Sequence, residues 1–375
     1  MGLNYSNMKI CCVFNYNPKY RYSIFSAMAD KFDCDFFFGN TIFQPLESFD
    51  TATLKGFKGF IKAKKIKFKG FVWYSDIFPV FNHKYTHYIL TGDFTMIINW
   101  LIILYAKVFR KKVFLWTHGI KTDKLSRRQR ILLRLFYTHV TGILMYNQYN
   151  CKYMKMIGCK DKCLHVFHNS LDTKLQSSYY KKLSPSHIYQ QHFNNEHPTL
   201  IYIGRIQRVK KTEQILDAMY LLKQKGIDLN LVVVGANIDD DIFTQKMEEF
   251  NLQKNVWMYG PCFDEVKNSE LIYNAAVCVS PGNVGLTCVH VLSYGTPVIT
   301  NDNFSTQMPE YEAIKKGITG DFFKENDIED LSDKISYWTS LTPEQRTICR
   351  NVARETIVNE WSVDYQINVL SNILK

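Results

Sequence analysis

Residues 200–218 read LIYIGRIQRVKKTEQILDA and contain the strand, loop and helix start that decide the fold. The apolar run predicts a strand that ends at Gly204, where a glycine permits close approach of the backbone to a ligand. Arg205 and Lys210, five residues apart, can converge on one anion at the start of the following helix. The stretch therefore predicts an anion site at a strand end, with two ordinary solvated loop residues as the alternative.

A second stretch, residues 279–300, reads VSPGNVGLTCVHVLSYGTPVIT. A strand runs into a Pro-Gly-Asn turn, a helix begins near Leu286, and Gly295 ends that helix before another strand. The backbone N–H groups from Val284 to Thr287 would open the helix and could hold phosphate oxygens. A β-α-β unit without any ligand would have the same pattern.

Apolar runs of strand length alternate with helix-period segments along the whole chain, which predicts an α/β protein with parallel sheets wrapped by helices. At 375 residues, the chain is long enough for two domains of ordinary size, and we expect both to be doubly wound and Rossmann-like. The predicted divisions are a first domain over 1–172, a polar linker over 173–197, a second domain over 198–355 and a C-terminal helical segment over 356–375 that returns toward the first domain.

The two quoted stretches resemble the retaining GT-B glycosyltransferases of family 4, many of which build bacterial surface polysaccharides and glycolipids. The pairing of G-R-x4-K with S-P-x3-G-L-x8-G-x-P-V-I about eighty residues later is specific to this family. The resemblance is firm over residues 199–323, and WTHG at 116–119 and HNSLD at 168–172 agree with the family in outline. It implies two Rossmann-like domains facing across a cleft, with the donor bound mainly by the second and the acceptor mainly by the first.

Three departures from the family pattern concern the site. The family usually carries two Glu residues eight positions apart around the second motif, where this chain has Gly282 and His290. Lys211 stands where a Gly normally follows the Lys, and NYNPK at residues 15–19 replaces the usual Gly-rich turn after the first strand. We therefore expect the contacts to the phosphates to be kept and the contacts to the ribose and the sugar to be made by other residues. Candidate replacements follow the strand that ends near residue 300: Gln307, Glu310 and Glu312.

The resemblance implies retaining transfer of a hexose-type sugar from a UDP- or GDP-type donor to a glycan or lipid-linked acceptor. Arg205 and Lys210 would neutralise the departing diphosphate. The departing phosphate oxygen would itself take the acceptor's proton, so no dedicated base is expected. His118, at the end of a predicted strand, would orient the donor sugar, with a structural histidine as the alternative. The expected donor-binding set is Gly204, Asn283, Val284, Gly285, Leu286, Thr287, His290, Glu310 and Tyr259.

Positive charge is concentrated in the first half of the chain. Residues 1–197 contain 29 Lys and Arg against 11 Asp and Glu, whereas the remainder contains 17 against 24. Two basic segments with interleaved apolar residues, 54–70 and 124–134, each predict a solvated helix face that could dock on anionic lipid, at about 1 kcal/mol per basic residue near the surface. No nucleic-acid motif is found, so a nucleic-acid partner is not expected.

Neither a cofactor nor a metal is expected. The acidic run at 239–241 suits helix capping, the ten cysteines lack zinc spacing, and no G-x-G-x-x-G follows the first strand, which argues against a nicotinamide enzyme such as a nucleotide-sugar epimerase. The longest apolar run, 96–108, is too short to span a bilayer. We expect a cytoplasmic protein, peripheral at the inner face of the membrane. Because both family Glu positions are lost, a catalytically degenerate GT-B binding or partner subunit is the alternative.

Overall fold

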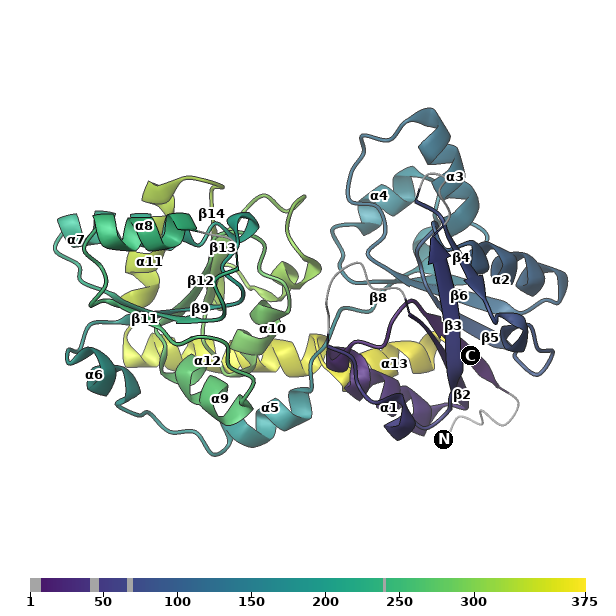
Figure 1. The fold of residues 1–375 in the computed structure, drawn as a ribbon, viewed down its shortest axis with the longest axis horizontal. Coiled ribbons are helices and arrows are strands. Elements are labelled where there is room, and N and C mark those ends of the chain that lie inside the picture. The colour runs from purple at the N-terminus through teal and green to yellow at the C-terminus, as the bar shows by residue number, and fades with distance from the viewer. Residues whose placement is uncertain (1–7, 41–46, 66–69, 239–240) are drawn as a thin grey trace. The chain divides into compact units, whose positions relative to one another are not determined.

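The structure is a computed structural model that describes residues 8–40, 47–65, 70–238 and 241–375. The chain divides into two compact units (Figure 1). The first unit consists of Met1–Leu171 with Val363–Lys375, and the second of Asp172–Ser362. Each unit is an α/β structure built around its own sheet, in which nearly all neighbouring strands are parallel, so the predicted fold class is confirmed.

The described part of the first unit has an eight-stranded sheet in the order β4-β3-β2-β1-β5-β6-β7-β8, and only β3 and β4 pair antiparallel. The strand order reverses between β1 and β5, so loops at the carboxyl ends of these strands open at the point where α/β sheets bind ligands. The strands are β1 (Ile10–Phe14), β2 (Cys34–Gly39), β3 (Phe57–Lys65), β4 (Val72–Ser75), β5 (His87–Thr91), β6 (Lys112–Thr117), β7 (Gly142–Met145) and β8 (Leu164–Val166).

Helices cover both faces of this sheet (Figure 1). One face packs on α1 (Tyr22–Lys31) and α13 (Val363–Ile373), which lie against each other, so the end of the chain completes the first unit's core. The helices on the other face are α2 (Ile97–Val108), α3 (Arg127–Tyr137) and α4 (Cys151–Met156).

The second unit's described residues form a six-stranded sheet, all parallel, in the order β11-β10-β9-β12-β13-β14. Numbered along the chain this is 3-2-1-4-5-6, the strand order of a Rossmann sheet, and its switch point lies between β9 and β12. The strands are β9 (Thr199–Ile203), β10 (Asn230–Val234), β11 (Val256–Met258), β12 (Val277–Ser280), β13 (Val298–Asn301) and β14 (Gly320–Phe323).

Helices also cover both faces of the second sheet (Figure 1). One face carries α7 (Glu213–Gln224), α8 (Asp241–Glu249) and α11 (Ile328–Thr339). The helices on the other face are α5 (Thr173–Tyr180), α6 (Ile188–Phe193), α9 (Glu265–Asn274), α10 (Leu286–Ser293) and α12 (Pro343–Glu360).

The segment predicted as a linker, residues 173–197, belongs to the second unit, where it forms α5 and α6. The buried Tyr189 anchors α6, because its hydroxyl donates to the carbonyl of Leu271 at 2.6 Å. These two helices are anchored by few apolar residues. Their composition therefore resembles that of a linker between domains. At the other end of the unit, α12 ends at Glu360 and the return to the first unit begins with α13 at Val363.

The basic segment 54–70 was predicted as a helix face, and this is wrong for its described core, which is the strand β3. Side chains along β3 alternate, with Ile61 buried and the flanking Phe60 and Lys62 exposed. Alternation with a period of two marks a half-exposed strand. Residues 66–69 lie outside the described residues.

Candidate functional site

The loops that follow β9 and β12 touch through their backbones at the switch point of the second unit. The N–H of Gly282 donates to the carbonyl of Lys210 at 2.9 Å. A Cβ atom on Gly282 would lie 2.5 Å from the carbonyl oxygen of Val209 and 2.7 Å from Cα of Lys210. Because both neighbours are backbone atoms, position 282 has no room for the glutamate that the resembled family carries there.

Lys210 is directed at the second loop. Its ammonium donates to the carbonyl oxygen of Asn283 at 2.7 Å and to the side-chain oxygen of the same residue at 2.5 Å. Burial, followed by the charge of Arg205, lowers the pKa of Lys210, while the carboxylate of Glu310 acts in the opposite direction. The predicted residues Arg205, Lys210, Asn283 and Glu310 are therefore within electrostatic or hydrogen-bonding reach of one another. An ammonium has three N–H donors, so one donor of Lys210 is left for a ligand.

The start of α10 lies next to this group. Gly285 precedes the helix with φ at +56°, a left-handed conformation that favours glycine. The hydroxyl of Thr287 donates to the carbonyl of Ile203 at 3.2 Å, which ties the helix start to the end of β9. The N–H groups of a first helical turn have no acceptor inside the helix. Gly285, Leu286 and Thr287 thus open α10 as predicted, near Lys210, and their role toward phosphate stays a prediction.

Val284 differs from this expectation, because its N–H donates to Oε1 of Gln307 at 3.1 Å. The amide nitrogen of Gln307 donates in turn to Gly282, Thr300 and Asn301, at 2.9–3.2 Å. This side chain is only 3% exposed. The side chain of Gln307 therefore holds the turn after β12 in place. Spacing along the sequence does not indicate this positioning role. The sequence offered Gln307 as a replacement contact to the ribose or the sugar, whereas its buried side chain hydrogen bonds to the turn.

His290 is already engaged by a residue from the neighbouring helix. Its Nε2 lies 2.9 Å from Oε1 of Glu265, at the start of α9, and the hydroxyl of Tyr294 donates to the same oxygen at 2.5 Å. Burial opposes ionisation of Glu265, but the hydrogen bonds from His290 and Tyr294 outweigh it and hold its pKa below the ordinary value. The resembled family has a glutamate at the position of His290. In this structure the histidine is bound to a carboxylate instead, that of Glu265.

The backbone conformation of Lys211 explains why the family pattern has a glycine at this position. Its φ is +50° and its ψ is +36°, in the left-handed region. This conformation costs an ordinary residue about 1–2 kcal/mol. The ammonium of Lys211 binds Oε1 of Glu325 at 2.6 Å and Oδ1 of Asn326 at 2.9 Å, and these charge-assisted contacts offset the cost.

Tyr259 lies apart from the other predicted donor residues. It follows β11, the edge strand, which is separated from β9 by β10. Two strand spacings place it about 10 Å from the end of β9 in the plane of the sheet. Its ring packs 5.1 Å from that of Trp257, on its own strand.

In the first unit, the sequence-predicted His118 follows β6 at the carboxyl edge of the sheet. Its ring packs against that of Tyr146 with centroids 4.3 Å apart, and its carbonyl accepts from Asn150 at 2.9 Å. Among the described residues, its buried Nδ1 has no hydrogen-bond partner. Burial, with smaller contributions from the charges of Lys121 and Arg21, lowers the pKa of His118 to about 3. The imidazole is therefore neutral at physiological pH and can donate or accept a single hydrogen bond.

Arg21 is a member of this cluster that sequence reasoning missed. Its guanidinium lies 4.8 Å from the ring centroid of Trp116 and hydrogen bonds to the hydroxyl of Tyr146. The segment at 168–172 lies on the same unit, where Gln366 of α13 binds the carbonyl of His168 at 3.1 Å and the hydroxyl of Ser170 at 2.6 Å. An arginine directly before α1 and a neutral histidine directly after β6 form a polar patch that suits the hydroxyl groups of a sugar.

Metal ligands and membrane-spanning helices were sought among the described residues. No group of three or more His, Cys, Asp or Glu side chains there could hold a metal ion, and Asp239 and Asp240 lie outside the described residues. No described helix combines the length and the apolar character that crossing a bilayer requires.

Residues 185–356 match the family model described as glycosyl transferases group 1. No curated protein is similar enough in sequence to count as a relative. Among solved structures, HepE of Anabaena in complex with UDP superposes with a TM-score of 0.70 at 14% identity, covering 98% of this chain and 100% of that chain. The lipopolysaccharide outer core galactosyltransferase WaaB gives 0.70 at 17%, with 98% and 99% covered. A structure of TarM gives 0.66 at 10%, with both chains fully covered. At these identities the likeness establishes a shared fold.

Proposed function

Since residues 185–356 form a group 1 glycosyl transferase domain in a chain with the GT-B fold, we propose that this protein transfers a sugar from a nucleotide-sugar donor to an acceptor. One observation carries the proposal. Lys210, Arg205 and the start of α10 meet at the switch point between β9 and β12. Two cations and a positive helix end at one place suit a diphosphate, whose negative charge increases as the bond to the sugar breaks.

The reaction that we propose is retaining transfer of a hexose-type sugar from a UDP- or GDP-type donor. The bond between the anomeric carbon and the diphosphate oxygen breaks, and the acceptor oxygen bonds to that carbon on the same face. The departing phosphate oxygen takes the acceptor's proton, so the leaving group ends with that proton and needs no protein base. Lys210 and Arg205 stabilise the diphosphate, and the neutral His118 orients the sugar through one hydrogen bond. A UDP-type donor is supported by HepE, which was solved with UDP and with UDP-glucose.

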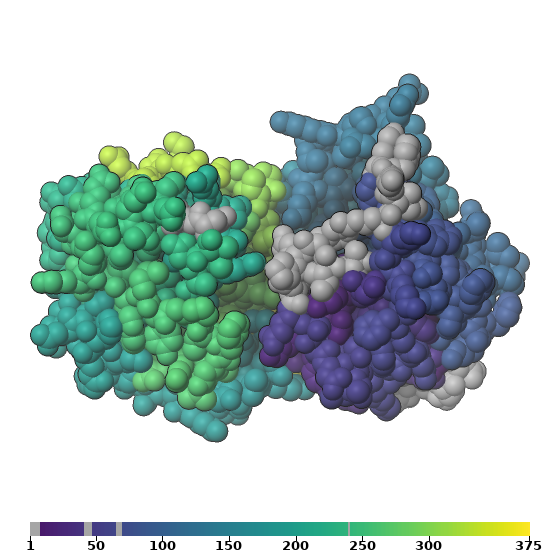
Figure 2. Space-filling model, in the orientation of Figure 1, coloured from purple at the N-terminus to yellow at the C-terminus, as the bar shows by residue number. Residues whose placement is uncertain are grey.

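We propose a glycan or lipid-linked acceptor, used in surface polysaccharide synthesis, and docking of the first unit on an anionic membrane at the cytoplasmic face. Support for docking comes from α3, where Ile131 and Leu135 are 53% and 50% exposed, one turn apart. Exposed arginines surround these two residues: Arg127, Arg128, Arg130 and Arg134. Figure 2 shows the blue segment that contains this helix at the surface of the first unit. An exposed apolar stripe between arginines fits a lipid surface with negative head groups.

A second candidate is a catalytically degenerate GT-B binding or partner subunit. It is favoured by the state of the two family glutamate positions, because Gly282 is closed in by backbone and His290 is held by Glu265. The carboxylate contacts to the donor that the family uses at these positions would then be absent or supplied from elsewhere.

A thermal-shift screen across UDP- and GDP-sugars, followed by an assay of donor hydrolysis without acceptor, tests both candidates. Donor at about 100 times its dissociation constant should add about 2.7 kcal/mol to the free energy of unfolding. Binding with hydrolysis supports the enzyme, and binding without hydrolysis or transfer supports the degenerate subunit. If no nucleotide sugar raises the melting temperature, the proposed function is wrong.

A further inference from the structure

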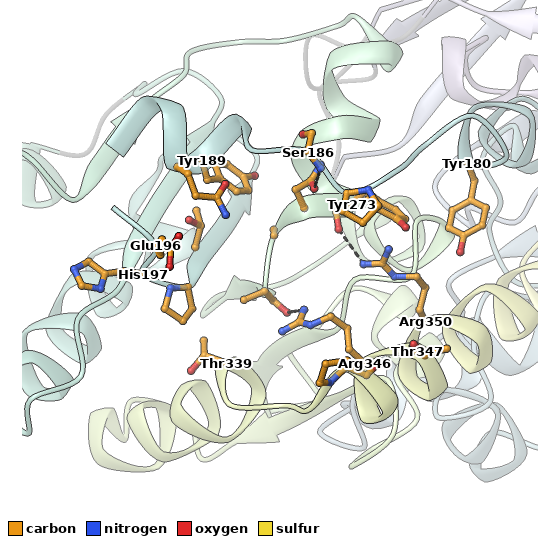
Figure 3. A pocket seen from close by; sticks show the side chains of 18 of the residues that line it. Tyr180, Ser186, Tyr189, Glu196, His197, Tyr273, Thr339, Arg346, Thr347 and Arg350 are labelled. Atoms are coloured by element: carbon orange, nitrogen blue, oxygen red, sulfur yellow. Dashed lines mark hydrogen bonds between the residues drawn. The ribbon is translucent and has the colours of Figure 1, made fainter. Parts of the chain in front are cut away.

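A cavity of about 640 Å³ opens in the second unit at the amino ends of β9 and β12 (Figure 3). Its walls come from α5, α6, α9 and α12, and we call it the amino-end cavity. Thr199 begins β9 here, whereas Gly204 follows the other end of that strand. At about 3.3 Å per residue, the cavity is about 16 Å from the proposed diphosphate site. Its volume lies within the range of small-molecule sites.

Two arginines one helical turn apart, Arg346 and Arg350 of α12, line this cavity. Arg346 donates to the carbonyl of Ala276 at 3.1 Å, and Arg350 donates to the carbonyl of Tyr273 at 3.0 Å. The guanidinium of Arg350 also lies 3.7 Å from the centroid of the Tyr273 ring. Each guanidinium has five N–H donors, so both retain donors for a ligand in the cavity.

The charge of this pair is not balanced by the protein. In the part of the chain that the structure describes, no carboxylate forms an ion pair with Arg346 or Arg350. The cavity's lining includes one carboxylate, that of the exposed Glu196, and Figure 3 shows it away from the two arginines. Arg346 also sits in the first turn of α12, where the helix dipole is already positive. Burial, and then the charge of Arg350, lowers the pKa of Arg346, as expected for a half-buried cation that lacks a counter-ion.

Capping of α9 is the structural alternative for the arginines, because Tyr273 and Ala276 lie at the end of that helix. Capping accounts for one N–H of each guanidinium. It does not explain why two cations share one cavity with no carboxylate beside them. An anion in the cavity would balance their charge.

We propose that the amino-end cavity is a second ligand site, for a phosphate monoester carried on a sugar-sized polar body. Two guanidinium groups one turn apart match the oxygens of a phosphate. Tyr273 offers an aromatic face, and Asn274 and Asn351 offer polar groups for the remainder of the ligand. This site stands apart from the proposed glycosyl transfer, since it uses none of the residues assigned to the donor.

Calorimetric titration of the full-length protein with glucose 6-phosphate, inorganic phosphate and glucose tests the site. We expect saturable binding of glucose 6-phosphate with a dissociation constant near or below about 1 mM. Inorganic phosphate should bind more weakly, and glucose should not bind in this range. Arg346→Gln and Arg350→Gln should each weaken glucose 6-phosphate binding about tenfold or more, because each removes a charge-assisted contact.

Arg208→Gln is the matched control, since it removes an arginine charge from an exposed position of the second unit that is not part of the cavity lining. It should bind glucose 6-phosphate like the wild type. Asn351→Ala keeps both arginines and removes an exposed polar group of the lining. It should weaken binding about threefold or more, so it decides the matter if an arginine variant fails to fold. Equal binding of phosphate and glucose 6-phosphate, displacement by excess UDP, or no binding up to about 10 mM would each overturn the proposal.

Discussion

The backbone N–H of Gly282 and the carbonyl oxygen of Lys210 are joined by a hydrogen bond of 2.9 Å that holds the loops after β9 and β12 together. This contact places the predicted phosphate-binding lysine beside the turn that opens α10. It also decides what residue 282 can be, because any Cβ there would press on the backbone of Val209 and Lys210.

We therefore predict that Gly282→Ala and Gly282→Glu both destabilise the second unit, by about 1–3 kcal/mol, the usual cost of overpacking. Urea unfolding with purified variants measures the loss. Restoring the family's glutamate should also fail to raise turnover, because the loop must move to admit it. A Gly282→Glu variant as stable as the wild type and more active would show that the loops are not fixed by this contact.

Arg205→Ala should lower kcat/KM about 10- to 150-fold, the equivalent of losing about 1.5–3 kcal/mol of a charge-assisted contact to the leaving group. The fold should be unaffected, because Arg205 is exposed. Arg208→Ala is the matched control, as it removes the same charge from an exposed position of the same loop. Equal activity of the Arg205 and Arg208 variants would contradict the assigned phosphate site.

Lys210→Met should reduce turnover at least as strongly as the change at Arg205. It keeps the aliphatic stem and removes the ammonium that holds Asn283 and faces the ligand. Circular dichroism and donor titration separate a local loss from unfolding. Wild-type donor affinity and turnover in this variant would exclude Lys210 from the site.

His290→Glu should destabilise the second unit more than His290→Ala, although glutamate is the residue of the family pattern. The new carboxylate would face that of Glu265, and two close carboxylates repel each other. The pKa of Glu265 is depressed by His290 and Tyr294, so the stability it contributes is present at neutral pH and is lost as the pH falls through its folded pKa, below the ordinary value near 4.5. Thermal melts at pH 7 and pH 4 measure both effects. If His290→Glu is stable and binds donor more tightly, position 290 contacts the ribose after all.

His118 should make the first unit less stable as the pH falls from about 6.5 to about 3. Its folded pKa of about 3 lies below the unfolded value of 6.5, so in this range the unfolded chain binds a proton that the folded protein does not. The slope from this residue is at most about 1.4 kcal/mol per pH unit. Urea midpoints of the wild type and His118→Gln at pH 7 and pH 5 test it, since the advantage of the wild type should shrink at pH 5. An unchanged difference would mean that His118 titrates normally in the folded protein.

The protein should bind vesicles of anionic lipid at low salt and leave them as salt rises, because the attraction is screened over about 8 Å at physiological ionic strength. Neutralising Arg127, Arg128 and Arg130 should weaken binding by about 1 kcal/mol for each charge. Neutralising Lys223 and Lys225, exposed in the second unit, serves as the control. Flotation with anionic and zwitterionic vesicles gives the readout, and no binding at low salt would refute docking.

Local sequence patterns were enough to predict the Rossmann character of both units and the position of the proposed phosphate site. In each case the information lies in contiguous residues. A strand, a Gly-Arg end and a helix start are encoded within residues 200–218 by local periodicity and turn chemistry. The same local pattern placed Lys210 and the start of α10 at strand ends, and parallel strands bring their ends to one edge of the sheet.

Contacts between these residues and partners far along the chain come from tertiary packing and could not be read from the sequence. Glu265 reaches His290 across 25 positions, Gln307 fixes the turn at Val284 from 23 positions away, and neither pairing leaves a periodic signal. Within the basic segment 54–70, Phe57–Lys65 forms the strand β3 because β2 and β4 flank it in the sheet, although the lysines of the segment also fit a helix face. The amino-end cavity likewise exists only where α12 returns beside β9, since its arginines and Thr199 are about 150 residues apart and are joined by packing alone.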